Sequence, residues 1–291
     1  MAIDDGQSRA TADITSKSTA SSAHAAPVRW RSAWVTGASS GIGRGLALRL
    51  ARGGCRVAAS ARSADKLGDL AGLDANIEPF PLDVTRAGAT ADTVDDIVER
   101  IGLPDIVILS AGIGRFASAS RLDAAYFRQM MTVNVIAVAD ALAPLIPQMI
   151  ARGSGHIVLV GSLAGYRGLP RAATYAPSKA AVISLAECLR FDLAPKGIVV
   201  TMINSGYVET PMTEDFDFPL PFLVPLETAL DKIMAGLAAE RFEVRFPWQM
   251  TLGLRLARLL PNGSYHRVIT RVLGPRPGSR GGEPRSRDGA E

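Results

Sequence analysis

The sequence predicts a single α/β domain built on a doubly wound, mostly parallel sheet of seven strands. Short apolar runs alternate with helix-length segments through the middle of the 291 residues without a break, as expected for strands joined by helical crossovers. The segments Asp105–Leu109 and His156–Val160 are almost continuously apolar, which is typical of strands that are covered on both faces. Hydrophobic residues make up 47% of the chain, enough for a substantial core.

The first half of the domain begins with a short apolar run, a glycine-rich turn and a segment rich in leucine and alanine. This order predicts a strand, a loop and a helix. The segment Thr90–Ile101 is amphipathic, with acids on the outer face of a predicted helix. The elements expected in this half are strands at Ser32–Thr36, Arg56–Ser60, Ile77–Leu82 and Asp105–Leu109, and helices ending at Arg52 and spanning Ser63–Leu73 and Thr90–Ile101.

The second half continues the same alternation. A long helix follows the fourth strand and ends near Arg152, before the sequence Gly-Ser-Gly. The remaining elements are strands at His156–Val160, Ile198–Ile203 and Phe242–Phe246, and helices at Ala173–Ala194 and Leu226–Glu240. In a doubly wound sheet, ligands bind at the carboxyl ends of the strands. We therefore expect the segments that follow strands to share one edge: Gly37–Gly43, Asp83, Ser110–Gly112, Ser162 and Asn204–Thr210.

Charge and cysteine content narrow the functional classes. The net charge is only +4, with basic and acidic residues interspersed, which does not suggest a nucleic-acid binder. Cys55 and Cys188 are far apart and give neither a disulfide framework nor metal-ligand spacing, so a reducing cytoplasm is the expected setting. The three histidines are scattered, and no metal is expected.

The termini and the most apolar segment also carry predictions. Residues 1–28 lack the apolar region of a secretory signal and are expected to form a disordered tail, as are residues 274–291. The stretch Thr132–Ile150 contains Asn134, Asp140 and two prolines. It is therefore interpreted as a buried helix rather than as a membrane span.

Tyr175 and Lys179 lie four residues apart in an alanine-rich helical pattern, so they share one face of the helix. An ammonium group near a phenol favours the phenolate and is expected to lower the tyrosine pKa toward neutrality. Such a pair can act as an acid/base device. The alternative from the spacing alone is a surface tyrosine beside a solvated lysine.

A glycine-rich turn, Gly37–Gly43, lies between the first strand and the first helix. Its spacing is Gly-x-x-x-Gly-x-Gly, which lets the backbone turn tightly and approach a phosphate at the helix N-terminus.

These two motifs, in this order, resemble the short-chain dehydrogenase/reductase family of the classical type, over roughly Ser32–Phe246. Further matches are Asp83-Val84, Ser110-Ala111-Gly112, Asn134-Val135, Ser162 and Asn204–Thr210. The family usually has Asn where this chain has Ser110, and Pro where it has Ser205. The resemblance implies a Rossmann fold, a nicotinamide cofactor and an oxidoreductase that forms homodimers or homotetramers.

The resemblance also implies a catalytic group of Asn134, Ser162, Tyr175 and Lys179. Tyr175 is expected to be the general acid in reduction and the general base in oxidation, with Lys179 lowering its pKa and holding the ribose. Ser162 is expected to donate to a substrate carbonyl; the alternative is a helix-capping serine. Asn134 is expected to loosen the long helix and position a water that relays protons to Lys179, or simply to bind the backbone.

The same resemblance implies the cofactor contacts. Asp83 is expected to accept from the adenine amine, with a turn-forming aspartate as the alternative, and Val208 and Thr210 are expected to meet the carboxamide. After the second strand stand Ala61 and Arg62, where an acid would favour NAD. Because a guanidinium can bind a 2′-phosphate, NADP(H) is expected over NAD(H). The cofactor-binding residues are expected to be Gly37, Ser39, Ser40, Gly41, Ile42, Gly43, Arg62, Asp83, Val84, Ala111, Gly112, Tyr175, Lys179, Val208 and Thr210.

Two segments remain. The loop 207–226 carries Phe216, Phe218 and Phe222; it either covers an apolar, lipid-like substrate or packs on the domain. Residues 248–273, which follow the catalytic domain at 29–247, repeat leucines at helical spacing and are expected to form an amphipathic extension. This extension is expected to pack on the domain or on a second subunit, or else to make peripheral contact with an acidic membrane.

The function predicted from the sequence is an NADP(H)-dependent oxidoreductase that interconverts a carbonyl and an alcohol. Two alternatives stay open: a lipid reductase associated with the membrane surface, and a non-catalytic NADP-binding regulator on the same fold.

Overall fold

The structure is a computed structural model that describes residues 28–116, 118–214, 216 and 218–274. The predicted tails therefore lie outside the described residues, except for Val28 and Gly274. Four short helical turns connect larger elements. These are η1 (Ala119–Arg121), η2 (Thr132–Ile136), η3 (Leu163–Gly165) and η4 (Ala194–Lys196).

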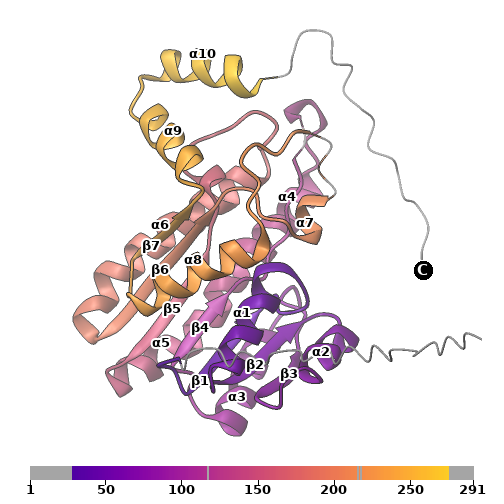
Figure 1. Cartoon of the computed structure of the whole chain (residues 1–291), viewed down its shortest axis with the longest axis vertical. Coiled ribbons are helices and arrows are strands. Elements are labelled where there is room, and N and C mark those ends of the chain that lie inside the picture. The colour runs from indigo at the N-terminus through magenta and orange to yellow at the C-terminus, as the bar shows by residue number, and fades with distance from the viewer. Residues whose placement is uncertain (1–27, 117, 215, 217, 275–291) are drawn as a thin grey trace, which may run out of the picture.

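Seven parallel strands form one sheet, which confirms the predicted fold class (Figure 1). Their order is β3-β2-β1-β4-β5-β6-β7, so the chain reverses its direction of travel across the sheet between β1 and β4. The strands are β1 (Ser32–Thr36), β2 (Arg56–Ala61), β3 (Ile77–Pro81), β4 (Ile106–Leu109), β5 (Gly155–Val160), β6 (Ile198–Ser205) and β7 (Glu243–Phe246). Each begins and ends within two residues of its predicted bounds.

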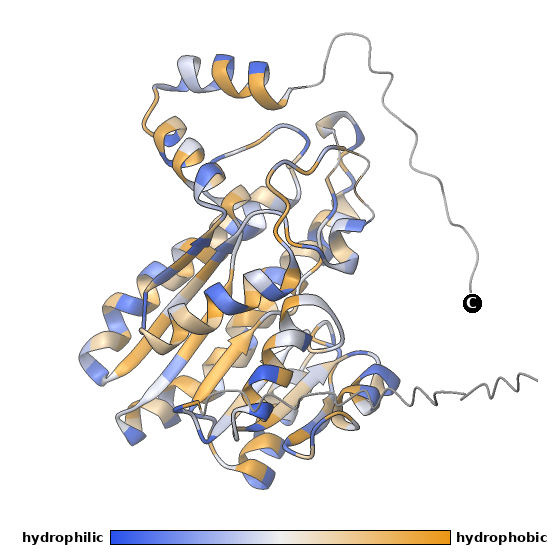
Figure 2. Cartoon of the chain, in the orientation of Figure 1, coloured by the Kyte–Doolittle hydropathy of each residue, from blue (hydrophilic) through white to orange (hydrophobic). Residues whose placement is uncertain are grey.

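Helices cover both faces of the sheet and create two hydrophobic cores. The helices whose apolar faces enter the first core are α1 (Gly41–Arg52), α2 (Ala64–Ala71) and α8 (Leu226–Ala238). Those that enter the second core are α3 (Ala89–Ile101), α5 (Ala137–Arg152) and α6 (Tyr175–Leu193). Figure 2 shows the consequence in the hydropathy pattern: the strands are largely hydrophobic, whereas the covering helices carry hydrophilic residues on their outer turns.

The predicted long helix is interrupted. It consists of α4 (Ala124–Met131), the π-helical turn η2 and α5, and Asn134 lies within the π-helical turn. Within the described residues, this 29-residue stretch is the one helix long and apolar enough to cross a membrane. Its Leu142, Leu145 and Met149 are buried in the second core, as expected of a core helix.

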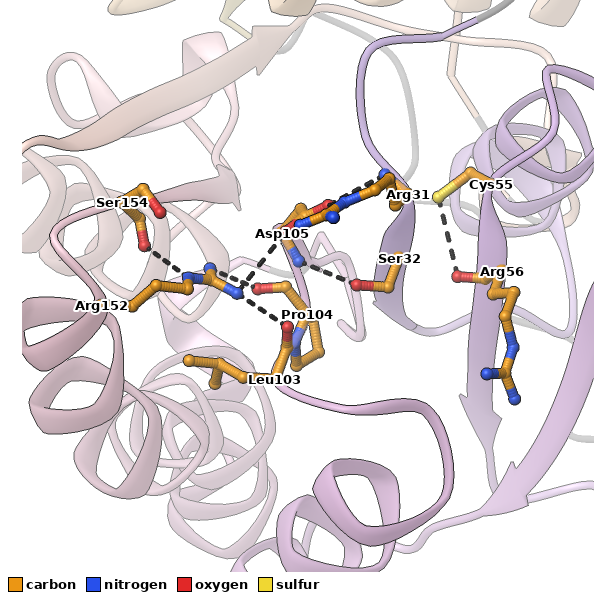
Figure 3. A network of polar contacts seen from close by, with 9 residues as sticks. All are labelled: Arg31, Ser32, Cys55, Arg56, Leu103, Pro104, Asp105, Arg152 and Ser154. Carbon is orange, nitrogen blue, oxygen red and sulfur yellow. Dashed lines mark hydrogen bonds and ion pairs between the residues drawn. The ribbon is translucent and has the colours of Figure 1, made fainter.

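A polar network fixes the amino ends of the strands, at the edge opposite the predicted site (Figure 3). Arg152 at the end of α5 donates to the carbonyl oxygens of Leu103 (2.8 Å) and Pro104 (2.9 Å), just before β4. The Asp105 carboxylate accepts from the backbone N–H of Arg31, and the Asp105 N–H donates to the Ser32 hydroxyl. These contacts tie the end of α5 to the starts of β4 and β1.

After β7 the chain forms two further helices, α9 (Trp248–Arg258) and α10 (Asn262–Leu273). In Figure 1 they lie at one end of the molecule, beyond the main body of the domain. A one-turn helix, α7 (Pro211–Glu214), lies in the loop between β6 and α8.

Candidate active site

A cavity of about 350 Å³ lies at the carboxyl ends of the strands. All fifteen residues predicted to bind the cofactor line it, and so does Ser162. Asn134 is buried behind the wall and does not line the cavity. The loops after β1 to β6 thus meet at one edge, as the parallel arrangement requires.

The glycine loop between β1 and α1 leaves room for an anion. Gly37 has φ +68°, and an added Cβ there would lie 2.9 Å from the Ala111 backbone. A Cβ at Gly43 would lie 2.4 Å from the Gly37 carbonyl oxygen, so only glycine fits this turn. Ser40, the N-cap of α1, makes no side-chain cap bond, and the first turn holds no acid. The helix N-terminus therefore retains N–H donors of the kind that bind a phosphate.

Thr36, at the end of β1, connects the glycine loop to the loop that follows β4. The sequence did not indicate a role for this residue. Its hydroxyl accepts hydrogen bonds from the N–H groups of Ser110 and Ala111, both at 3.1 Å. A threonine at the last position of a strand gives little signal by itself, because β-branched residues are common throughout strands.

Tyr175 begins α6 and points into the cavity beside Ser162. Both side chains line the cavity, and the Ser162 hydroxyl acts to lower the pKa of the tyrosine. Ser162 also donates to the Ser205 carbonyl oxygen (3.3 Å) and accepts from the Ala164 N–H (3.1 Å). The alternative interpretation of this serine is confirmed, because it caps the turn η3; its donation to a substrate carbonyl stays a prediction.

The prediction that Lys179 lowers the pKa of Tyr175 toward neutrality was wrong. Burial raises the pKa of Tyr175 to about 12 and lowers that of Lys179 to about 8. The lysine ammonium donates to the Val160 carbonyl oxygen (2.8 Å) and lies 5.8 Å from the centre of the Tyr175 ring. The pair does share one face, but loss of water dominates the charge effect that the spacing predicts.

Asn134 holds its position through the π-helical turn. Its side-chain oxygen accepts from the Ile113 N–H, and its amide group donates to the Ile113 carbonyl (2.9 Å each) and to the Ser178 hydroxyl (3.0 Å). A Cβ added to Gly112 would lie 3.3 Å from the Asn134 oxygen and 3.6 Å from the Lys179 nitrogen. Asn134 thus binds the backbone of Ile113, which was the alternative interpretation of this residue. It also lies close to Lys179.

The cofactor-side residues Asp83 and Arg62 lie near each other at the ends of β3 and β2. Asp83 forms a turn: one oxygen, Oδ1, accepts from the hydroxyl (2.7 Å) and the N–H (2.9 Å) of Thr85. These bonds lower the pKa of the Asp83 carboxyl, and the charges of Arg62 and Arg86 lower it further. Arg62 is exposed and lines the cavity. The site therefore offers a carboxylate and a guanidinium that are close enough for their charges to interact.

Aromatic side chains form the other wall of the cavity. Phe116 lies 5.2 Å, between ring centres, from both Tyr175 and Phe216, and Phe216 stacks on Phe218 at 5.2 Å. Phe222 is 53% exposed and is absent from this cluster, so the predicted trio is only partly assembled. The sequence did not point to Phe116, because it is a single aromatic residue in the loop after β4 and belongs to no motif or periodic pattern.

The C-terminal helix α9 completes this wall. Met250 and Leu254 line the cavity together with Met212 and Leu169. Arg167, five residues after Ser162, donates to the carbonyl oxygens of residues 257, 258 and 260 at the end of α9.

The same guanidinium stacks on the Tyr265 ring of α10 at 3.8 Å. The extension is therefore joined to the segment that carries the candidate catalytic serine.

The sequence of this chain matches that of a known protein family. The sequence model of the short chain dehydrogenases matches residues 31–218. The chain is a short-chain dehydrogenase/reductase. It is therefore an oxidoreductase with the fold of that family, as the glycine loop and the Ser162–Tyr175–Lys179 arrangement indicated.

Relatives of this short-chain dehydrogenase/reductase cover most of its length. An uncharacterized oxidoreductase of Myxococcus xanthus is 40% identical over 253 residues, which is 85% of this chain and 99% of the relative. The 3-oxoacyl-[acyl-carrier-protein] reductase FabG of Thermotoga maritima is 34% identical over 72% of this chain and 85% of its own. A gluconate 5-dehydrogenase from Burkholderia cenocepacia, solved with NADP and tartrate, superimposes with a TM-score of 0.71 at 25% identity, over 79% of this chain and 98% of the other.

Proposed function

We propose that this protein is an NADP(H)-dependent oxidoreductase that interconverts a carbonyl and an alcohol on an apolar substrate, with Tyr175 as the general acid and base. The observation that carries the proposal is that Ser162, Tyr175 and Lys179 line one cavity together, with the glycine loop on one side and aromatic rings on the other.

The chain's own residues supply orientation and proton transfer. The hydroxyls of Ser162 and Tyr175 together can hold a carbonyl oxygen, and Tyr175 then gives up its proton. With a pKa of about 12, Tyr175 keeps this proton at neutral pH, which is the form needed for carbonyl reduction. Lys179 and Asn134 lie behind the tyrosine and can return the proton. A bound nicotinamide would supply the hydride.

An apolar substrate is favoured by the wall opposite the glycine loop. Phe116, Tyr207, Phe216, Met250 and Leu254 all line the cavity there. Pockets of this kind bind apolar groups through buried area, while a few polar groups fix orientation.

The preference for NADP(H) is supported by Arg62, which lines the cavity at the end of β2 where NAD-specific sites hold an acid. The Burkholderia relative was itself solved with NADP. The glycine loop and the uncapped N-terminus of α1 fit the phosphates, and Asp83 Oδ2, which accepts no hydrogen bond within the described residues, can serve the adenine amine.

The proposal is tested by turnover of the purified chain with NADPH on a panel of long-chain and short-chain ketones, aldehydes and 3-oxoacyl thioesters. The thioesters are included because of the Thermotoga relative. We expect measurable reduction of apolar carbonyls and little of small polar ones. NADPH binding without turnover on any carbonyl or alcohol would indicate the non-catalytic regulator instead.

Tyr175→Phe provides the decisive variant, because it removes the proton and keeps the ring. Turnover should fall about 10²–10⁴-fold, the usual contribution of a positioned acid or base, while NADPH binding, followed by its fluorescence, stays within about twofold. Phe191→Ser, on the exposed side of α6, is the control. Retention of more than a few per cent of turnover in Tyr175→Phe would remove Tyr175 from its role.

A further inference from the structure

The outer face of α9 carries a stripe of exposed apolar side chains. Trp248, Leu252, Leu256 and Leu259 are exposed by 70%, 51%, 57% and 81%. Their spacing of three and four residues places them on one face of the helix. We call this set the α9 stripe. So large an apolar face on a soluble domain marks a surface that contacts something else.

The opposite side of α9 belongs to the protein. Met250 and Leu254 line the cavity, and Ala257 is buried against Tyr265 and Ile269 of α10. One helix therefore separates the apolar cavity from an apolar outer face. The next helix also exposes apolar side chains: Val268, Val272 and Leu273 are exposed by 43%, 70% and 44%.

The charges on these two helices have a single sign. Residues 248–273 contain no aspartate or glutamate, and Arg255, Arg258, Arg267 and Arg271 are all exposed. This segment alone accounts for the net charge of +4, so the rest of the chain is balanced. An exposed tryptophan and leucines beside arginines, without acids, are the composition of helices that lie in the interface of an anionic bilayer.

We propose that α9 and α10 dock this enzyme on the surface of an anionic phospholipid bilayer, with the α9 stripe inserted among the acyl chains. The inference rests on the proposed function in one respect: docking would place the apolar cavity next to the source of an apolar substrate. Met212 lines that cavity and is itself 40% exposed, so apolar surface continues from the cavity to the outside.

A second copy of the chain fits the same face less well. A two-fold contact places the same patch of both copies together, and arginines would then face arginines with no carboxylate from residues 248–273 between them. Anionic headgroups supply the missing charge, and their attraction falls as salt screens it.

The three tryptophans make docking directly measurable. Trp30 and Trp34 are buried (6% and 0% exposed), whereas Trp248 is exposed. Insertion of the stripe should therefore shift the fluorescence of Trp248 alone to shorter wavelength. The full chain is mixed with vesicles of phosphatidylglycerol and phosphatidylcholine, and with vesicles of phosphatidylcholine only. We expect flotation with the anionic vesicles, a blue shift, and loss of both at high salt.

Two variants test the stripe and the charge separately. The triple variant Leu252→Ser, Leu256→Ser, Leu259→Ser should bind anionic vesicles at least about tenfold more weakly. Arg255→Gln with Arg271→Gln should also weaken binding and should reduce its salt dependence, because two of the four arginines are removed. The matched control is Phe191→Ser, which removes an equally exposed apolar residue (82%) from α6 and should bind as the starting protein does.

Three results would overturn the proposal: no binding to anionic vesicles at low salt, binding that survives the triple serine variant, or a change from dimer to monomer in that variant without vesicle binding. The last result would make the face an interface between copies of the chain. None of these measurements requires turnover. Failure of docking is thus distinct from failure of the proposed reaction, which is measured on soluble carbonyls.

Discussion

At the scale of single residues, the candidate catalytic groups Asn134, Ser162 and Lys179 are shielded from water, and Tyr175 is half-buried. Lys179 is 6% exposed and Ser162 8%, and burial shifts the pKa values of Tyr175 and Lys179 toward their neutral forms. A cationic ligand group or a developing oxyanion placed here would meet little competition from solvent, because electrostatic interactions are stronger in a site that excludes water.

Arg62 is predicted to set the cofactor preference. Arg62→Ala should lower the ratio of kcat/KM for NADPH over NADH about 10- to 100-fold, since a charge-assisted contact contributes about 1.5–3 kcal/mol. The control is Arg86→Ala, whose charge also acts on Asp83 but which does not line the cavity. Equal use of both cofactors by the starting protein would contradict the assignment.

The identity of the residues in this site could be predicted from the sequence, whereas their pKa values could not. Glycine spacing and the Tyr-x-x-x-Lys pattern are local, so they can be recognised without a fold. The pKa of Tyr175 depends on its burial, in a site where the Phe116 ring lies 5.2 Å from its own and Tyr207 lines the same cavity; both come from distant parts of the chain. Thr36 and Phe116 were missed for the same reason: their partners are set by tertiary contacts.

At the scale of elements, Arg167 makes several of the contacts that hold α9 and α10 to the domain. Arg167 donates to three carbonyl oxygens at the end of α9 and to the Asn262 side chain, and it stacks on Tyr265. Tyr265 in turn donates to the Gly168 carbonyl oxygen at 2.8 Å. Carbonyls at a helix C-terminus have no partner within the helix, so a cation there stabilises the helix.

Arg167→Ala is expected to loosen the extension without unfolding the domain. The loss should be about 1–3 kcal/mol, and it should appear as faster amide hydrogen exchange in residues 248–273. Arg190→Ala, which removes a guanidinium stacked on Phe242 elsewhere, should leave that exchange unchanged. Equal protection in both variants would show that Arg167 does not anchor the extension.

The helical repeat of leucines indicated two amphipathic helices after residue 247, and α9 and α10 are found there. The sequence could not predict which face of α9 packs against the domain. Leucine occupies both sides of α9: Leu254 lines the cavity, while Leu256 and Leu259 face outward. The contacts of Arg167 with the extension could not be predicted either, because an arginine in a loop belongs to no periodic pattern.

At the scale of the whole molecule, acid sensitivity has an identifiable source. His156 on β5 is 1% exposed, and burial lowers its pKa to about 4. The Thr201 hydroxyl donates to the Arg241 carbonyl oxygen, so it accepts from the His156 Nε2–H at 2.9 Å. Nδ1 then has no proton and no partner among the described residues. Protonation would leave a buried cation beside the Trp30 ring.

Stability should therefore fall as pH decreases from about 6.5 to about 4. In this window the unfolded histidine takes up a proton and the folded one does not, so unfolding is favoured by up to about 3 kcal/mol. His156→Gln keeps an N–H donor for Thr201 and should flatten this part of the profile. Denaturant unfolding at several pH values measures it, and an unchanged slope in the variant would assign the effect to other groups.

The strand order 3-2-1-4-5-6-7 has a consequence for how the chain reaches its native state. Among the described strands none pairs through a tight hairpin: even β1, third in the sheet, must find β4, with Ala33 opposite Ile106. Closing such loops costs entropy before any strand contact repays it. We expect refolding to be slow relative to helical proteins of this size. Fragments that end before β4 should aggregate, because β1 would then present an open apolar edge.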